Sequence, residues 1–181
     1  MVKKIALSIL TIILVSSCSI QGLTSDFGKL NENQKSKIIL LTSFEKIETN
    51  YIYKINGVQL KQELKKYPKS IVYIFKNGCT SDLCKPLLIY ENYAKKNDFK
   101  LFLVMDGYAE LNETLEQPIS SPLFVINNEY YKSNIRANYS RYFENEITSK
   151  PLHEKNSEYL GSLYFFNEDK LDRILKLLPK E

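Results

Sequence analysis

Apolar runs and amphipathic stretches alternate along most of the chain. Continuous apolar runs predict strands buried on both faces, and apolar residues repeating every three or four positions predict helices. The strands are expected at 51–55, 70–75, 99–105, 122–127 and 159–166, and the helices at 37–49, 58–67, 83–94, 109–116, 139–147 and 167–178. Alternating strands and helices predict an α/β fold with a central mixed sheet flanked by helices.

The first of these helices is expected to extend the domain at its N-terminus, and the last is expected to close it. Apolar residues spaced by about three over 37–49 predict an N-terminal helical extension, and Asn167 is placed to cap the closing helix. Between the strands at 122–127 and 159–166, the polar stretch 132–157 predicts an irregular insertion that holds a single helix.

The first residues have the layout of a secretory signal peptide. Lys3 and Lys4 precede a mostly apolar run from Ile5 to Val15, and small residues follow it. This run is shorter than the roughly 20 residues that a membrane-spanning helix needs. We therefore expect residues 1–17 to be removed on export.

The end of this segment resembles the lipobox of bacterial lipoproteins. Val15-Ser16-Ser17-Cys18 places small residues before a cysteine. The resemblance implies cleavage before Cys18 and lipidation of its sulfur and new amino group, and several acyl chains give stable anchoring to a membrane. Residues 18–36 are then the lipidated cysteine and a flexible tether. Ser19 implies the outer membrane under sorting rules of the enterobacterial type, so the domain is expected outside the cytoplasm, in the cell envelope.

Charge and length limit the classes of function. Removing residues 1–17 leaves enough chain for one domain with a proper core, expected at 37–181. Loss of Lys3 and Lys4 lowers the formal net charge from +4 to +2. This balance does not favour nucleic-acid binding or a polybasic membrane patch. We find no glycine-rich phosphate loop, Ser/His/Asp set or zinc-binding spacing.

Two cysteines remain after Cys18 is assigned to the lipid anchor. Cys79 and Cys84 follow the apolar strand 70–75, and an exported chain can keep a disulfide. If both cysteines lay in one helix, their side chains would be about 500° apart in rotation and would not meet. For a disulfide to close within about 7 Å between Cα atoms, Cys79 must lie in the loop.

The order of motifs over residues 50–178 resembles that of the thioredoxin-like superfamily. A buried strand precedes the cysteines, and Cys84-Lys85-Pro86 opens an amphipathic helix. The segment Ser120–Ile126 looks like the loop and strand in which this superfamily keeps a cis-proline. A strand containing Gly161 and a closing helix follow.

The resemblance implies a membrane-anchored thiol–disulfide oxidoreductase that needs no cofactor and acts on protein or peptide disulfides. Cys79 would attack the substrate disulfide and Cys84 would resolve the mixed disulfide. A cysteine just ahead of a helix meets unpaired N–H groups and the positive end of the helix dipole, which favour the thiolate. Ser121 and Pro122 would face the pair and bind the substrate, although Ser121-Pro122 also suits the simple start of a strand.

Three departures from the superfamily pattern favour an alternative without catalysis. Four residues separate the cysteines instead of two, and Asn77-Gly78 stands where an aromatic residue is usual. Tyr73 falls where thioredoxin has a carboxylate that relays protons, and a tyrosine is no base at neutral pH. The nearest acid in sequence, Asp82, disfavours a thiolate if it lies close. The alternative is a thioredoxin-like binding or accessory lipoprotein, so enzyme activity stays open.

A third reading is a copper chaperone similar to the Sco type, which uses two cysteines and a distal histidine. His153 would be that histidine, because thiolates suit Cu(I) and imidazole suits Cu(II). A single histidine in a charged loop is usually just solvated, and we therefore assign no metal ligand.

Overall fold

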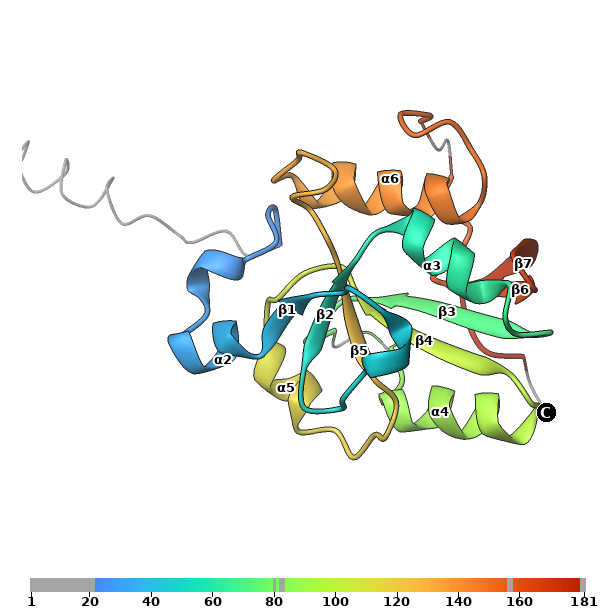
Figure 1. The fold of residues 1–181 in the computed structure, drawn as a ribbon, viewed down its shortest axis with the longest axis horizontal. Coiled ribbons are helices and arrows are strands. Elements are labelled where there is room, and N and C mark those ends of the chain that lie inside the picture. Colours follow the sequence, from blue (N-terminus) through green and yellow to red (C-terminus); the bar gives the residue numbers. More distant parts are fainter. Residues whose placement is uncertain (1–21, 80, 82–83, 156–157, 180–181) are drawn as a thin grey trace, which may run out of the picture.

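The computed structural model describes residues 22–79, 81, 84–155 and 158–179, and it contains a seven-stranded mixed sheet with helices on both faces (Figure 1). The predicted α/β class is thereby confirmed. The strands are β1 (Ile38–Leu40), β2 (Ile52–Ile55), β3 (Ser70–Phe75), β4 (Lys100–Met105), β5 (Leu123–Ile126), β6 (Leu163–Asn167) and β7 (Lys170–Leu175). The helices are η1 (Phe27–Lys29), α2 (Glu32–Ser36), η2 (Phe44–Lys46), α3 (Gly57–Leu64), α4 (Leu87–Lys96), α5 (Leu111–Leu115) and α6 (Arg136–Ile147).

The strands follow the order β1-β2-β5-β4-β3-β6-β7 across the sheet. The first five in this order run parallel to one another, whereas β6 is antiparallel to β3 and β7 is antiparallel to β6. The carboxyl ends of the parallel strands therefore share one edge of the sheet, which we call the carboxyl edge.

Strand β3 lies in the middle of two hydrophobic cores. All six of its residues are buried, as its continuous apolar run predicted. Because side chains alternate between faces, Tyr73 and Phe75 pack toward α4, while Val72 and Ile74 pack toward α3 and α6. Figure 1 shows α4 on one face of the sheet and the α3–α6 pair on the other.

The expected helix over 37–49 is not formed. Ile38–Leu40 is strand β1 instead, and it pairs in parallel with β2, while η2 adds a single turn after it. The apolar spacing was interpreted as a helical face, but the β-branched Ile38 and Ile39 suit a strand that can use the free edge of β2.

The expected closing helix is also wrong. Lys170–Leu175 forms β7, which is joined to β6 by a tight turn in which Glu168 has a positive φ of 53°. Asn167 pairs with Lys170 across this hairpin and caps no helix. Leu171, Ile174 and Leu175 fit a helical face, yet the exposed edge of β6 provides hydrogen-bond partners that an isolated helix would lack.

The helix expected at 139–147 is confirmed as part of α6, but the stretch 132–157 is not simply irregular, because this helix belongs to the core. Its buried residues Tyr139, Phe143 and Ile147 have 0 % exposure and repeat at every fourth position. This repeat was visible in the sequence, but the many polar residues around it obscured the signal for a core helix.

Residues 22–36, expected to belong to the tether, are packed against the domain. They form η1 and α2, and Leu30 is buried in the core on the α4 side of the sheet. A buried ion cluster holds the segment: the Arg136 guanidinium lies 3.1 Å from Asp26 Oδ2 and 3.4 Å from Asp106 Oδ1. Its Nε also donates to the Thr24 carbonyl.

The two carboxylates of this cluster respond differently to burial. Burial opposes ionisation of Asp26, but bonds from Lys29 and the Gly22 N–H, with the charges of Lys29 and Arg136, outweigh it and lower its pKa. For Asp106, burial is the stronger effect and raises the pKa despite the nearby Arg136. The guanidinium is therefore needed to keep two carboxylates inside the fold.

We expect Arg136→Met to lower the free energy of unfolding by about 3 kcal/mol, because it removes the guanidinium that contacts both carboxylates. Lys29 still pairs with Asp26, but Asp106 loses this ion pair. Urea denaturation at pH 7 measures this change. Arg141→Met is the matched control: Arg141 is only half-buried on the same helix and has a long 3.5 Å contact with Asn138. Equal losses in the two variants would contradict a special role for the buried cluster.

Glu144 of α6 provides a pH-dependent contribution to stability. Burial, reinforced by the charge of Asp106, raises its pKa from 4.5 to about 7, against the opposing effects of the Tyr164 hydrogen bond and Lys150. The folded protein therefore keeps this proton at pH values where the unfolded chain has lost it. Stability from this group is greatest below pH 4.5 and falls as the pH rises to about 7.

Glu144→Gln should remove this loss, because glutamine still accepts a bond from Tyr164 and carries no charge. Relative to the wild type, the variant should gain roughly 3 kcal/mol in unfolding free energy between pH 4 and pH 8. Denaturation curves across this range test the prediction, with the exposed Glu116→Gln as control. The prediction would be wrong if the unfolding free energy of Glu144→Gln depended on pH in the same way as that of the wild type.

Candidate redox site at the carboxyl edge of the sheet

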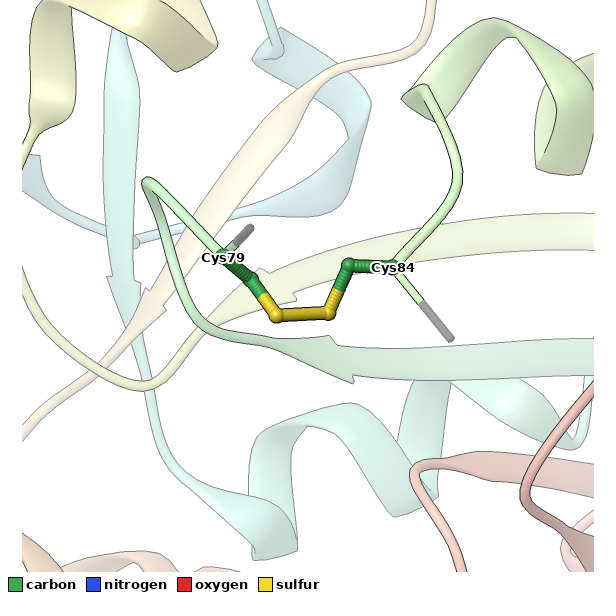
Figure 2. The surroundings of a disulfide bond; sticks show 2 residues. All are labelled: Cys79 and Cys84. Atoms are coloured by element: carbon green, nitrogen blue, oxygen red, sulfur yellow. A yellow bond between two sulfur atoms is a disulfide. The ribbon is translucent and has the colours of Figure 1, made fainter. Parts of the chain in front are cut away.

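A disulfide joins Cys79 and Cys84 in the loop between β3 and α4, with 6.0 Å between their Cα atoms. Figure 2 shows the two side chains pointing toward each other from opposite ends of this loop. The pairing was predicted, and so was the position of Cys79 outside the helix. Both cysteines are half-buried, so the sulfur atoms lie at the surface of the domain.

Asn77 fixes the start of the loop. This side chain is 5 % exposed; its Nδ2 donates to the Gly107 carbonyl over 2.9 Å, and its Oδ1 accepts from Thr114 Oγ1 over 2.7 Å. The loop is thereby joined to the end of β4 and to α5. Gly78 then turns the chain with a positive φ of 64°, close to the side chain of Glu110.

The disulfide opens onto a cleft of about 360 Å³ between the loop, the start of α4 and α5. Its charged groups are Lys76 and Lys85 on the loop side and, among the described lining residues, the single carboxylate of Glu113 on α5. Two ammonium groups beside one carboxylate give the described part of the cleft a positive balance, which favours a thiolate after reduction.

Tyr73 forms part of the cleft wall, at the place where a proton-relaying carboxylate was sought. It is 5 % exposed and its ring stacks on Tyr90 with 4.0 Å between ring centroids. Burial, with a hydrogen bond to Tyr90, raises its pKa far above the ordinary value. Tyr73 therefore stays protonated and cannot act as a base.

The amino end of α4 lies beside the disulfide, but its first N–H is already bonded. The Leu87 N–H donates to Gln117 Oε1 over 2.7 Å. Cys84 lies three residues before the helix begins and Cys79 eight residues before it. Both cysteines line the cleft together with Leu87, so the disulfide lies on the side of the domain where α4 begins.

Ser121 and Pro122 are not placed opposite the cysteines. They precede β5. Leu123, the first residue of β5, pairs in register with Leu103 of β4. Leu103 in turn pairs with Tyr73 in the middle of β3. Since these strands are parallel, Pro122 lies away from the carboxyl edge, with β4 in between. The Ser121 hydroxyl donates to Glu91 of α4 over 2.7 Å. All peptide bonds in the described ranges are trans, including that of Ser121-Pro122.

Two other prolines line the cleft: Pro86, just before α4, and Pro118, next to Gln117. The sequence analysis did not predict Gln117, Pro118, Asn77 or Thr114 as site residues. The contacts that place them join the cysteine loop and the start of α4 to residues that are distant in sequence. The amide of Asn77 directly before a glycine was the one local signal of a fixed turn.

His153 does not join the cysteines. Its ring contacts Tyr142 of α6, which packs on the α3–α6 face, whereas the cleft opens on the α4 face. No group of three metal-ligating side chains occurs in the part of the chain that the structure describes. The copper-chaperone hypothesis therefore lacks a histidine ligand near the two cysteines. Asp82 and the lipobox cysteine Cys18 lie outside the described residues.

No protein-family model matches the sequence, and no match was found among curated proteins or solved structures. Among the helices that the structure describes, none has the length and apolar character that a membrane crossing requires.

Gly78→Ala tests how tightly the loop is held. A Cβ atom at this position would lie 2.6 Å from Glu110 Cγ, and alanine disfavours the positive φ by about 1–2 kcal/mol. We expect a comparable loss of unfolding free energy in the oxidised protein, measured by urea denaturation. Gly28→Ala is the control, because a Cβ there meets nothing within 4 Å. A neutral Gly78→Ala variant would contradict a rigid loop start.

Proposed function

We propose that this protein is a thiol–disulfide oxidoreductase of thioredoxin-like type, anchored in the bacterial cell envelope by lipid on Cys18. The observation that carries the proposal is the half-buried Cys79–Cys84 disulfide, which opens onto a cleft at the carboxyl edge of the sheet. In open α/β sheets, this edge is the usual position of ligand and active sites.

The arrangement of elements supports the thioredoxin-like assignment. Strand β3 leads into the cysteine loop and α4, parallel β4 lies on one side of β3, and the antiparallel β6 lies on its other side. In the sequence, strand β5 and helix α6 come between β4 and β6. In the sheet, β5 pairs with the other side of β4. This position of β5 explains why Pro122 is separated from the cysteines by a strand.

The position of the disulfide favours a redox role over a purely structural one. It joins the two ends of one short loop, with a sequence separation of five, and connects no second element to the domain. Closing so short a loop restricts the unfolded chain little and contributes about 2 kcal/mol. Its reduction should therefore leave the domain folded, as a reversible redox site requires.

The reaction of the reduced pair with a disulfide substrate needs no cofactor. The Cys79 thiolate attacks one substrate sulfur, which forms a mixed disulfide and releases the first substrate thiol. The Cys84 thiolate then attacks Cys79, releases the second thiol and restores the Cys79–Cys84 disulfide. Two electrons and two protons pass from the pair to the substrate, and the reverse sequence oxidises a dithiol.

The second candidate is a thioredoxin-like binding or accessory lipoprotein in which the disulfide does not turn over. Tyr73 favours this candidate, because it occupies the position of a proton relay and remains protonated. A redox-active site here must exchange protons with solvent through the open cleft. The two candidates therefore differ in whether the pair cycles at physiological potentials.

We expect the soluble fragment that begins at Ser19 to show a reversible two-electron transition between roughly −120 and −270 mV. Thiol trapping across a series of glutathione ratios measures it. A pair that remains oxidised below about −300 mV would be a structural disulfide and would favour the second candidate.

Single cysteine variants assign the roles within the pair. Cys79→Ser should reduce exchange with a peptide disulfide to the background rate, whereas Cys84→Ser should accumulate the mixed disulfide on Cys79, detectable by mass spectrometry. Accumulation on Cys84 in the Cys79→Ser protein would reverse the assignment. Unchanged exchange in both variants would refute the oxidoreductase.

A further inference from the structure

Two exposed apolar residues occupy neighbouring backbone positions near the start of the described chain. Leu23 is 58 % exposed and Ile135, just before α6, is 55 % exposed. The Arg136 N–H donates to the Leu23 carbonyl over 2.8 Å, which brings the two positions side by side although they are far apart in sequence. We call Leu23 and Ile135 the entry surface.

The entry surface is close to the proposed lipid in covalent terms. Four peptide steps separate Cys18 from Gly22, and each spans at most about 3.6 Å, so Gly22 lies within roughly 14 Å of the Cys18 Cα atom. This limit holds for any conformation of the intervening residues. A tether of this length cannot hold the domain far from the bilayer.

The segment from Gly22 onward is firmly attached to the domain. The Gly22 N–H donates to Asp26 Oδ2, Arg136 Nε donates to the Thr24 carbonyl, and the Tyr108 N–H donates to the Ser25 carbonyl. The short distance therefore applies to the folded domain and restricts its orientation as well as its position.

We propose that the entry surface rests on the bilayer that holds the lipid of Cys18. This inference depends on the lipid anchor in the proposed function. The acyl chains provide the membrane affinity, and the two apolar side chains set the orientation by entering the interfacial region. Lys132, exposed in the turn before Ile135, is suited to anionic headgroups.

The entry surface and the disulfide loop are connected to the same part of the sheet. Ser25 is bonded to Tyr108, and the adjacent Gly107 carbonyl accepts from Asn77, two residues before Cys79. The entry surface and the disulfide loop are therefore both attached to the end of β4 at the carboxyl edge.

The chain contains no tryptophan, so one substitution creates a single fluorescent reporter. The lipidated full-length protein is placed in vesicles of phosphatidylethanolamine and phosphatidylglycerol with brominated acyl chains, and tryptophan emission is recorded. Ile135→Trp is the decisive variant, because it is near the lipid only through the tertiary fold, and Leu23→Trp supports it. Ile89→Trp on α4 and Leu177→Trp near the opposite end of the described chain are controls, exposed by 45 % and 43 % (Figure 1).

We expect blue-shifted emission and bromine quenching for the two entry-surface reporters, and neither for the controls. Equal quenching of Ile135→Trp and Ile89→Trp, or no quenching of Ile135→Trp, would overturn the proposal. Circular dichroism and thiol counting confirm that each variant is folded with its disulfide intact.

Lipidation is measured separately, by the mass of the mature protein and by loss of vesicle binding in Cys18→Ser. A lipidated protein without quenching at Ile135→Trp would refute the orientation alone and leave the proposed function standing. A mature protein without acyl groups would remove the anchor and the orientation together. The redox measurement uses the soluble fragment and is independent of both.

Discussion

The buried guanidinium of Arg136 is the interaction on which the arrangement of the carboxyl edge depends. It binds Asp26 and Asp106, and its atoms fill the space where a Cβ on Gly107 would lie, within 2.7 Å. It thus holds the N-terminal segment, the start of α6 and the end of β4 in one place. Without this charge, the burial of Asp26 and Asp106 would be less well compensated and the fold less stable. Asp106 directly precedes Gly107, whose carbonyl accepts the hydrogen bond from Asn77.

The disulfide loop depends on this frame at its first residue and is free of other elements at its tip. Asn77 is bonded to Gly107 and Thr114, whereas the disulfide closes only its own loop. The base of the loop is thus held by side-chain hydrogen bonds to other elements, whereas the disulfide connects no other element to the loop. Tyr73 beneath it is buried and stays protonated, and the charged side chains described around the disulfide are Lys76, Lys85 and Glu113.

Local patterns predicted the central elements because burial and periodicity agree there. Strand β3 matches its predicted bounds, and α3 begins at a capping box in which Asn56 and Gln59 bond each other's backbone. The terminal elements were predicted wrongly for the opposite reason. Their apolar spacing suited a helix, but β1 and β7 found open sheet edges at β2 and β6. A free edge exists only in the assembled sheet, so the hydrophobic pattern of the segments that form β1 and β7 does not indicate it.

The sequence by itself determined the α/β class and the buried strand before the cysteines, because these follow from neighbouring residues. The pairing of Cys79 with Cys84 was predicted on the condition that Cys18 carries the lipid, and the structure shows the disulfide directly. Only the tertiary structure decided that β5 enters the sheet beside β4, which moves Pro122 away from the cysteines and brings Pro118 and Gln117 to them. It also decided that residues 22–36 pack on the domain, because the partners of Asp26 and Leu30 come from distant parts of the chain. Contacts of this kind depend on how strands are ordered across a sheet, and apolar periodicity carries no information about that order.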